Sequence, residues 1–536
     1  MLEPLAVVPI FVNAGAAVLP TILGALVTAG SLILRPRELV RTCRRRPLTA
    51  LLVLAALAGV STLVGVLLTR DNAQAAQRAD RPRAAGQRDW AKIAVEIIER
   101  EQLESALTRP GSAPVATVPA STPVEPVADA PIILGRSPSR CGYDGGPVPL
   151  GLLPLWRHTE EDTMFLSSPA VLNGRVYGAS CQLDIAGKYG SIFCLDANTG
   201  KVIWRTDAIG SENLKPFFSS PAVTQDGKRL VIGQGLHDDA DCSLLCFDAA
   251  TGGLCWRVKT PFHIESSPAI WGDMAVVGAG QIDHGPAAKS GFVLAVRVSD
   301  GAELWRFALR DPESSPVVSD DGVVYVGAGF SGNEVVALRS QSDEELRAKK
   351  LDRVLWRAPC PYPVTGSIAI AGDLVIAGAG NGDYVHADPS PAGLVLALDR
   401  RTGQVRWQRP MDDAVLGPVA ARGGKLICPV RNGEVVALDL KDGTPLWRRR
   451  VSGKAPILAG TAFTGKHVFA VSRDGYLCVM DAENGQPVER NLYLNDEGKP
   501  GEMGLTLSTP TVAGGRVFVG TETGGLRCFV GTRTVP

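Results

Sequence analysis

The chain has 536 residues, and its 55 basic and 55 acidic side chains give a formal net charge of zero. This balance argues against nucleic-acid binding, which requires a basic surface, and against a polycationic partner, which requires an acidic tail. The 59 glycines and 38 prolines favour a turn-rich β fold.

Two apolar segments begin the chain. Residues 1–34 are mostly apolar from Leu5 onward, and residues 48–69 contain no charged side chain. About 20 apolar residues suffice to cross a bilayer, so we expect a first transmembrane segment at 1–34 and a second transmembrane helix at 48–69. A cleaved signal peptide fits less well, because no positively charged region precedes Leu5.

The loop at 35–47 predicts the orientation of these segments. It carries six arginines, which the positive-inside rule assigns to the cytoplasm. We therefore expect a two-pass protein of the cytoplasmic (inner) membrane, with everything after residue 69 on the extracytoplasmic side.

Residues 70–150 are expected to form a spacer. Apolar side chains at Ile93, Ile97, Ile98 and Leu103 predict a short amphipathic helix at about 89–107. This helix would bind a partner, dimerise or pack on the domain that follows. Residues 108–131 are rich in proline and small residues, which is typical of an extended linker.

A tryptophan recurs at a nearly fixed period after residue 150. Successive members are 48, 52, 49, 51, 51 and 40 residues apart, and the position 42 residues after the last one holds Glu489. A period of this size indicates a repeat architecture. The seven members are Trp156, Trp204, Trp256, Trp305, Trp356, Trp407 and Trp447.

Each repeat is predicted to contain four short strands, A to D. The A strand opens with a motif such as Ser168-Pro-Ala-Val, and the D strand carries the tryptophan after an Asp-x-x-Thr-Gly turn. Eight openings occur, but the last repeat lacks a D strand, and Trp156 precedes the first opening. We therefore expect an all-β, eight-bladed β-propeller with four-stranded antiparallel blades over 151–536, preceded by two N-terminal transmembrane helices. The strand near Trp156 would close the ring, and the tryptophans would pack between blades.

The motif from Asp196 to Trp204 and its copies resemble the tryptophan-docking repeats of the quinoprotein-like (PQQ-repeat) β-propellers. The resemblance covers roughly Leu150 to Val530. That family contains PQQ-dependent alcohol and glucose dehydrogenases and also non-enzymatic BamB-like members. The dehydrogenases hold Ca²⁺ and often have a vicinal Cys-Cys pair, which this sequence lacks.

The resemblance therefore implies a BamB-like scaffold that is not an enzyme, needs no cofactor and binds another envelope protein. Two alternatives stay open. One is a PQQ- or metal-dependent oxidoreductase, and the other is a sensor whose propeller binds a small ligand.

The sequence predicts no catalytic residue, but it points to one face of the ring. The D–A and B–C loops converge there, and ligands of propellers usually lie at the axis. His263 and Glu265 lie in one D–A loop and Glu313 in the next, so we expect an axial binding face for a cation or a basic peptide segment.

Other loops carry imidazole and carboxylate groups together, the donors that divalent metals prefer. Solvated loops also collect such residues without a metal, so no metal centre is expected. The weak candidates are His237, Asp239, Asp283 and His284.

Cysteine positions indicate core packing. Cys194, Cys246, Cys478 and Cys528 occupy a C-strand position that alanine fills in other repeats. Cys246 and Cys255 flank one hairpin, and a disulfide between them is geometrically plausible.

Overall fold

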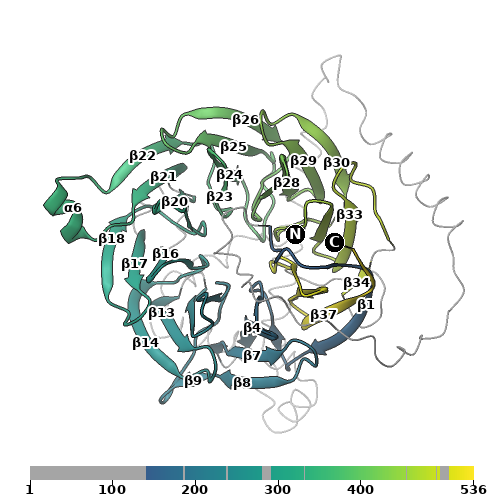
Figure 1. Cartoon of the computed structure of the whole chain (residues 1–536), viewed down its shortest axis with the longest axis horizontal. Coiled ribbons are helices and arrows are strands. Elements are labelled where there is room, and N and C mark those ends of the chain that lie inside the picture. Colours follow the sequence, from purple (N-terminus) through teal and green to yellow (C-terminus); the bar gives the residue numbers. More distant parts are fainter. Residues whose placement is uncertain are drawn as a thin grey trace, which may run out of the picture. The chain divides into compact units, whose positions relative to one another are not determined.

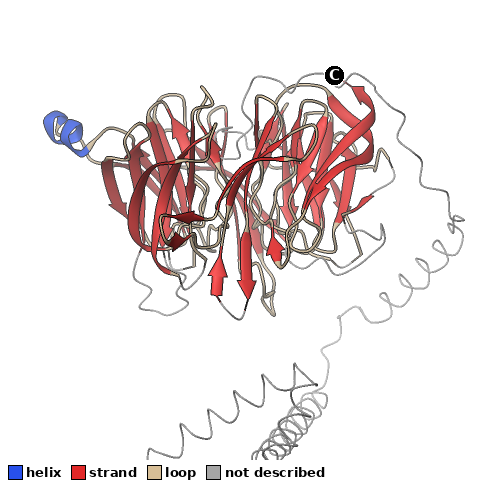
Figure 2. Cartoon of the chain, turned by 90° about the horizontal axis from the view of Figure 1, so that it is seen from below, coloured by secondary structure: helices blue, strands red, loops and turns tan. Residues whose placement is uncertain are grey.

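The computed structural model describes residues 141–535, except 185–186, 237–238, 281–290, 331, 454, 490–491 and 495–505. These described residues form eight four-stranded antiparallel sheets that are arranged as blades around a central axis (Figure 1). The first strand of each blade lies nearest the axis and the last lies at the rim (Figure 1). In the side view, the strands run roughly along this axis (Figure 2).

The blades, numbered in chain order, contain the following strands from the axis outwards: blade 1, β3 (Ala170–Leu172), β4 (Arg175–Ala179), β7 (Ile192–Asp196) and β8 (Val202–Thr206); blade 2, β11 (Ala222–Val223), β12 (Arg229–Gly233), β13 (Ala240–Asp248) and β14 (Leu254–Phe262); blade 3, β15 (Ala269–Trp271), β16 (Met274–Gly280), β17 (Gly291–Arg297) and β18 (Glu303–Ala308); blade 4, β19 (Val317–Val318), β20 (Val323–Ala328), β21 (Glu334–Arg339) and β22 (Val354–Pro359); blade 5, β23 (Ala369–Ala371), β24 (Leu374–Gly380), β25 (Gly393–Asp399) and β26 (Val405–Met411); blade 6, β27 (Ala420–Arg422), β28 (Lys425–Val430), β29 (Glu434–Asp439) and β30 (Pro445–Arg450); blade 7, β31 (Ala462–Phe463), β32 (His467–Val471), β33 (Tyr476–Asp481) and β34 (Leu492–Tyr493); blade 8, β35 (Thr511–Ala513), β36 (Arg516–Val519), β37 (Leu526–Val535) and β1 (Val148–His158). Two small sheets lie outside the blades: β2 (Thr163–Met164) with β5 (Cys181–Asp184) and β6 (Gly187–Tyr189), and β9 (Ala208–Ile209) with β10 (Glu212–Asn213).

Blade 8 is assembled from both ends of the described chain. Its outer strand β1 pairs antiparallel with β37, and Trp156 lies opposite Cys528 in this register. Leu150 and Leu152 of β1 are buried in the core between blades 7 and 8. This pairing leaves the ring without an open gap between its first and last blades, as ring closure of a sheet requires.

Each repeat tryptophan docks on the following blade. Its indole Nε1 donates a hydrogen bond of 2.7–3.1 Å to a backbone carbonyl where the C strand of that blade ends. Removing a large buried aromatic side chain typically costs about 3–5 kcal/mol. The donor–acceptor pairs are Trp156–Ala197, Trp204–Ala249, Trp256–Val298, Trp305–Ser340, Trp356–Arg400, Trp407–Leu440 and Trp447–Ala482.

The contacts of the tryptophan ring explain two other features of the repeat. The ring lies against the glycine of the next turn, so that a Cβ on Gly200 would come within 2.6 Å of Trp156. Gly200 also has a φ of +68°, which favours glycine. Across its own sheet, each tryptophan lies opposite a buried alanine or cysteine, as Trp204 lies opposite Cys194. A larger residue there would compete with the indole for space.

Blade 4 replaces the C–D turn with a helix, α6 (Asp343–Lys349). Ser342 caps it through a capping box with Glu345, as the charged sequence after Gln341 favours. Arg353, which follows α6, lies over the ring of Trp305 at 4.5 Å and takes the place of the turn glycine. Trp305 is only 1% exposed, so its ring is buried at this junction at least as completely as the rings that pack on a glycine.

The predicted transmembrane helices require a correction. No helix of the described residues is long and apolar enough to cross a membrane. The helix that they contain, α6, has seven residues and spans about 10 Å, against about 30 Å for a bilayer core. The predicted segments at 1–34 and 48–69, the loop at 35–47 and the spacer helix near 89–107 lie outside the described residues. The fold class that the structure supports is the all-β ring alone.

Candidate functional site

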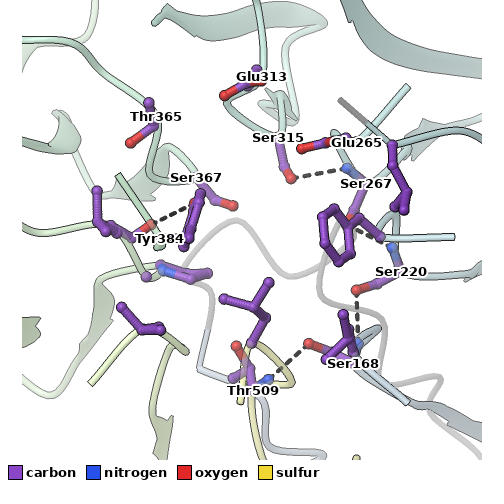
Figure 3. Close-up of a pocket in the computed structure, with 18 of the residues that line it drawn as sticks. Ser168, Ser220, Glu265, Ser267, Glu313, Ser315, Thr365, Ser367, Tyr384 and Thr509 are labelled. Carbon is purple, nitrogen blue, oxygen red and sulfur yellow. Dashed lines mark hydrogen bonds between the residues drawn. The ribbon is translucent and has the colours of Figure 1, made fainter. Parts of the chain in front are cut away.

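A chain of hydrogen bonds runs around part of the axis, where the A strands begin. In five successive blade junctions, a hydroxyl accepts a hydrogen bond of 2.9–3.0 Å from the equivalent backbone nitrogen of the preceding blade. Figure 3 shows the bonds that link Ser315, Ser267, Ser220, Ser168 and Thr509. This explains the serine of the Ser-Pro opening and fixes the loop before each A strand. The pairs are Gly460–Thr509, Thr509–Ser168, Ser168–Ser220, Ser220–Ser267 and Ser267–Ser315, with the nitrogen named first.

A cavity of about 300 Å³ opens at this end of the axis. Residues of all eight blades line it, so we call it the axial pocket. Its wall includes a ring of residues from the eight D–A loops, most of them two positions before the A-strand hydroxyl. We call this ring the collar; it consists of Leu166, Phe218, Glu265, Glu313, Thr365, Leu416, Leu458 and Leu507.

The collar has an acidic side and an apolar side. Glu265 and Glu313 come from the adjacent blades 3 and 4 and lie on the same side of the opening (Figure 3). Most of the other collar residues are apolar. Val385, from the B–C loop of blade 5, adds an apolar side chain that is 54% exposed.

His263 lies beside the two glutamates. One ligand atom from each of His263, Glu265 and Glu313 lies within 4.8 Å of the others. The Nε2 atom of His263 is 3.8 Å from Oε1 of Glu313, and both side chains are less than one-tenth exposed. The structure therefore brings together the three residues that the sequence assigned to an axial face, in one group that could hold a metal ion.

Asp311 extends this group in a way that the sequence did not indicate. It is 2% exposed, and its Oδ2 accepts a hydrogen bond of 2.7 Å from the nitrogen of Phe330. Burial and the neighbouring charge of Glu313 raise the pKa of Asp311 to about 8. A φ of +43° turns its backbone toward this position, and no periodic feature of the repeat marks such a turn.

Tyr384 lines the opposite part of the same wall. Burial, together with the charges of Glu313 and Glu265, raises the pKa of its phenol. Its hydroxyl donates a hydrogen bond of 3.3 Å to the carbonyl of Leu416. The phenol therefore stays protonated, and it could donate to an anionic group only by leaving that carbonyl.

The other predicted metal candidates are not assembled by the described residues. His237, Asp283 and His284 lie outside them. Asp239 accepts a hydrogen bond of 2.8 Å from the nitrogen of Leu236 and forms an ion pair with Lys188 at 3.5 Å. These two contacts account for the position of the Asp239 side chain without a metal ion.

The cysteines of the described residues are all free thiols, including Cys246 and Cys255. Cys246 lies opposite Trp256, while Cys255 is the extra residue of a β-bulge and is exposed. The disulfide considered from the sequence is therefore not formed in this structure. Cys194, Cys246, Cys478 and Cys528 are each at most 1% exposed, in agreement with core packing.

A family comparison matches most of this ring. The family model described as "Outer membrane protein assembly factor BamB" matches residues 154–390 and 391–532. The chain belongs to this family. The resemblance inferred from the repeat motif is thereby confirmed.

Individual relatives include both BamB proteins and quinone-dependent dehydrogenases. "Outer membrane protein assembly factor BamB" of Yersinia pestis is 23% identical over 64% of this chain and 81% of its own length. The dehydrogenase subunit of "Alcohol dehydrogenase (quinone)" of Gluconobacter oxydans (strain 621H) is 26% identical, over 49% of this chain but 35% of its own length.

Solved structures agree on the fold. Quinohemoprotein alcohol dehydrogenase from Comamonas testosteroni aligns with a TM-score of 0.54 and 14% identity, over 74% of this chain and 80% of its own. The computationally designed protein Ika8 aligns with a TM-score of 0.51 and 16% identity, over 70% of this chain and 99% of its own. At these identities the alignments establish the architecture only.

Proposed function

We propose that this chain is a protein-interaction scaffold of the cell envelope and that it binds a segment of another envelope protein at the axial pocket. Its family membership supports this role, because relatives in that family are named as assembly factors for outer membrane proteins. The proposed binding place rests on the axial pocket itself, which residues of all eight blades line and which has an apolar side.

The apolar side of the collar fits an extended segment that presents apolar side chains. Phe218 and Val385 line the pocket and are at least partly exposed, so a partner can reach them without unfolding the ring. An exposed apolar side chain beside a cavity is a typical anchor point of a binding site. The hydrogen-bonded A-strand starts hold the collar in place, which lowers the entropic cost of binding.

Site-specific photocrosslinking in living cells tests this proposal. A photoreactive amino acid is placed at Phe218 or Val385, and a control is placed at Trp271, which is 40% exposed in the A–B hairpin of blade 3, at the other end of the strands. We expect the two positions in the axial pocket, 218 and 385, to capture the same envelope protein and position 271 not to capture it. Equal capture from all three positions would rule out the axial pocket as the binding surface.

A pair of valines in blade 5 gives a matched substitution test. Val385 is 54% exposed at the pocket, and Val405 is 53% exposed on the outer strand β26. The Val385→Asp variant should lose most of the crosslink from position 218, whereas Val405→Asp should keep it. Retention of the crosslink in both variants would contradict the proposal.

The dehydrogenase relatives raise the question of a quinone cofactor. Pyrroloquinoline quinone is a tricarboxylate, and such a ligand needs cationic partners. Among the described residues that line the axial pocket, Lys188 is the one cationic side chain, against Glu265 and Glu313. These residues do not fit the cofactor, and we propose that the scaffold works without it. Quinone absorbance together with dye reduction, after addition of the quinone and Ca²⁺, would contradict this.

A further inference from the structure

The acidic side of the axial pocket contains the donor set of a metal site. His263 supplies an imidazole nitrogen, and Glu265 and Glu313 each supply a carboxylate oxygen, all within 4.8 Å of one another. Glu265 and Glu313 occupy equivalent positions in adjacent D–A loops, and each precedes a hydroxyl of the chain around the axis, Ser267 or Ser315. The backbone that carries these two donors is therefore fixed before any ligand arrives.

Asp311 gives a second, independent indication of a cation. Its Oδ1 atom is buried and has no hydrogen-bond partner within the described part of the chain, although Oδ2 is satisfied by Phe330. Its electrostatic neighbours are Glu313, His263 and Glu265. A buried polar oxygen without a hydrogen-bond partner is unfavourable, and the acidic groups of Glu265 and Glu313 nearby increase that cost. A bound cation would give Oδ1 of Asp311 a partner and would offset the negative charge of the neighbouring glutamates.

We propose that His263, Glu265 and Glu313, with Asp311 beside them, bind one divalent transition-metal ion such as Zn²⁺ or Mn²⁺. The imidazole nitrogen argues against Ca²⁺ and Mg²⁺, which prefer oxygen ligands only. Glu265 and Glu313 also line the cavity, so the ion would keep an open position toward the axial pocket. Even with the ion bound, three carboxylates leave this side without net positive charge, so it stays unsuited to a tricarboxylate.

The geometry needs only small movements to become a coordination shell. Ligand atoms around a tetrahedral Zn²⁺ lie about 3.3 Å apart when the bonds are about 2.0–2.1 Å long. Nε2 of His263 and Oε1 of Glu313 are 3.8 Å apart, and all three ligand atoms lie within 4.8 Å of one another, so each pair has to approach by no more than about 1.5 Å. This inference does not depend on the scaffold role, because metal binding can be measured on the chain alone.

Metal binding is tested on the full-length chain after removal of metals with a chelator. Titration calorimetry with Zn²⁺ or Mn²⁺, and elemental analysis after gel filtration, should show about one tightly held ion per chain. Co²⁺ offers a readout that needs no variant: nitrogen and oxygen coordination in a four- or five-coordinate site gives intense visible absorption, whereas hexahydrated Co²⁺ does not. If none of Zn²⁺, Mn²⁺ and Co²⁺ is retained through gel filtration and the titrations show only heat of dilution, the proposal is overturned.

Substitutions locate the ion. His263→Gln and Glu313→Gln should each weaken binding by at least about tenfold, since even a ligand's hydrogen-bonding partners contribute 10–100-fold. His386→Gln is the matched control, because His386 is 81% exposed and lies 3.5 Å from Asp383, a surface pair of the same two chemical groups. Loss of binding in His386→Gln with retention in the other two variants would show surface binding only and would refute the axial site. Circular dichroism checks that each variant is folded.

Discussion

The carboxylate of Glu489 accepts a hydrogen bond from the backbone nitrogen of Gly151, which ties blade 7 to the strand that closes the ring. A second bond of 3.4 Å reaches Glu489 from the nitrogen of Leu152. At the other seven junctions, a tryptophan donates to a carbonyl at the end of the next C strand. Blade 8 has no covalent C–D connection, because its D strand is β1 from the other end of the chain. Glu489 supplies the acceptor for two backbone nitrogens of this strand.

Replacing Glu489 by alanine should lower the free energy of unfolding by about 1–3 kcal/mol, because two backbone donors lose their acceptor. The measurement is urea denaturation followed by tryptophan fluorescence. Glu483→Ala is the control: Glu483 belongs to the same blade and is 72% exposed, and its ion pair with Lys425 should contribute under about 1 kcal/mol. Glu489→Trp restores the repeat pattern but should also be less stable than the wild type. A Glu489→Trp variant as stable as the wild type would disprove our explanation of the lost tryptophan.

Gly403 and Gly372 separate backbone strain from steric contact in one blade. Both have positive φ, +70° and +59°. A Cβ on Gly403 would lie 2.6 Å from the Trp356 ring, whereas a Cβ on Gly372 would meet nothing within 4 Å. Gly403→Ala should therefore destabilise the chain by about 1–3 kcal/mol more than Gly372→Ala, because overpacking is added to the strain. Thermal unfolding of the two variants checks this, and equal losses would mean that the indole moves aside freely.

Thiol reactivity should follow burial. Cys255 is exposed, whereas burial raises the pKa of Cys181 and Cys242 to about 12 and also raises that of Cys246. Iodoacetamide at pH 8 should therefore modify Cys255 in the native chain and the other three only after denaturation, as read by peptide mapping. Rapid native labelling of Cys246, or a peptide that links it to Cys255 under non-reducing conditions, would contradict the structure.

His467 should make the chain less stable in mild acid. Burial lowers the pKa of its imidazole, and Nδ1 has no hydrogen-bond partner among the described residues. The unfolded chain thus binds this proton more readily than the folded chain, so stability falls as pH drops through the unfolded value of about 6.5. The wild type should lose more unfolding free energy between pH 7.5 and pH 5 than His467→Gln. Parallel pH profiles for the two proteins would exclude this contribution.

The sequence predicts the ring well because the contacts that build it leave a mark in every repeat. The indole of Trp204 requires a small residue opposite it and a glycine in the next turn, and all three recur at fixed spacing. Irregular junctions carry no such mark. Nothing in the period shows that Glu489 replaces an indole contact or that Arg353 covers Trp305.

The candidate site was predictable to the same extent. Glu265 and Glu313 could be placed at the axis from the sequence, because both stand two positions before the A-strand hydroxyl. His263 could be placed near them by its position in the same loop. Asp311 could not, since a single left-handed residue in one D–A loop brings it there. Candidates drawn from the B–C loops, such as Asp239, share the chemistry but have no repeat position that fixes them.

The pairing of β1 with β37 makes the complete ring a property of the whole chain. Thr532 and Leu150, which contact each other in this seam, are 382 residues apart. A ribosome adds about 5–20 residues per second, so β1 waits on the order of tens of seconds for its partner strand to be made. Its apolar edge is a binding surface for chaperones, or for other nascent chains, throughout that interval. A product that stops before β37 never buries that edge, so the seam distinguishes finished chains from truncated ones.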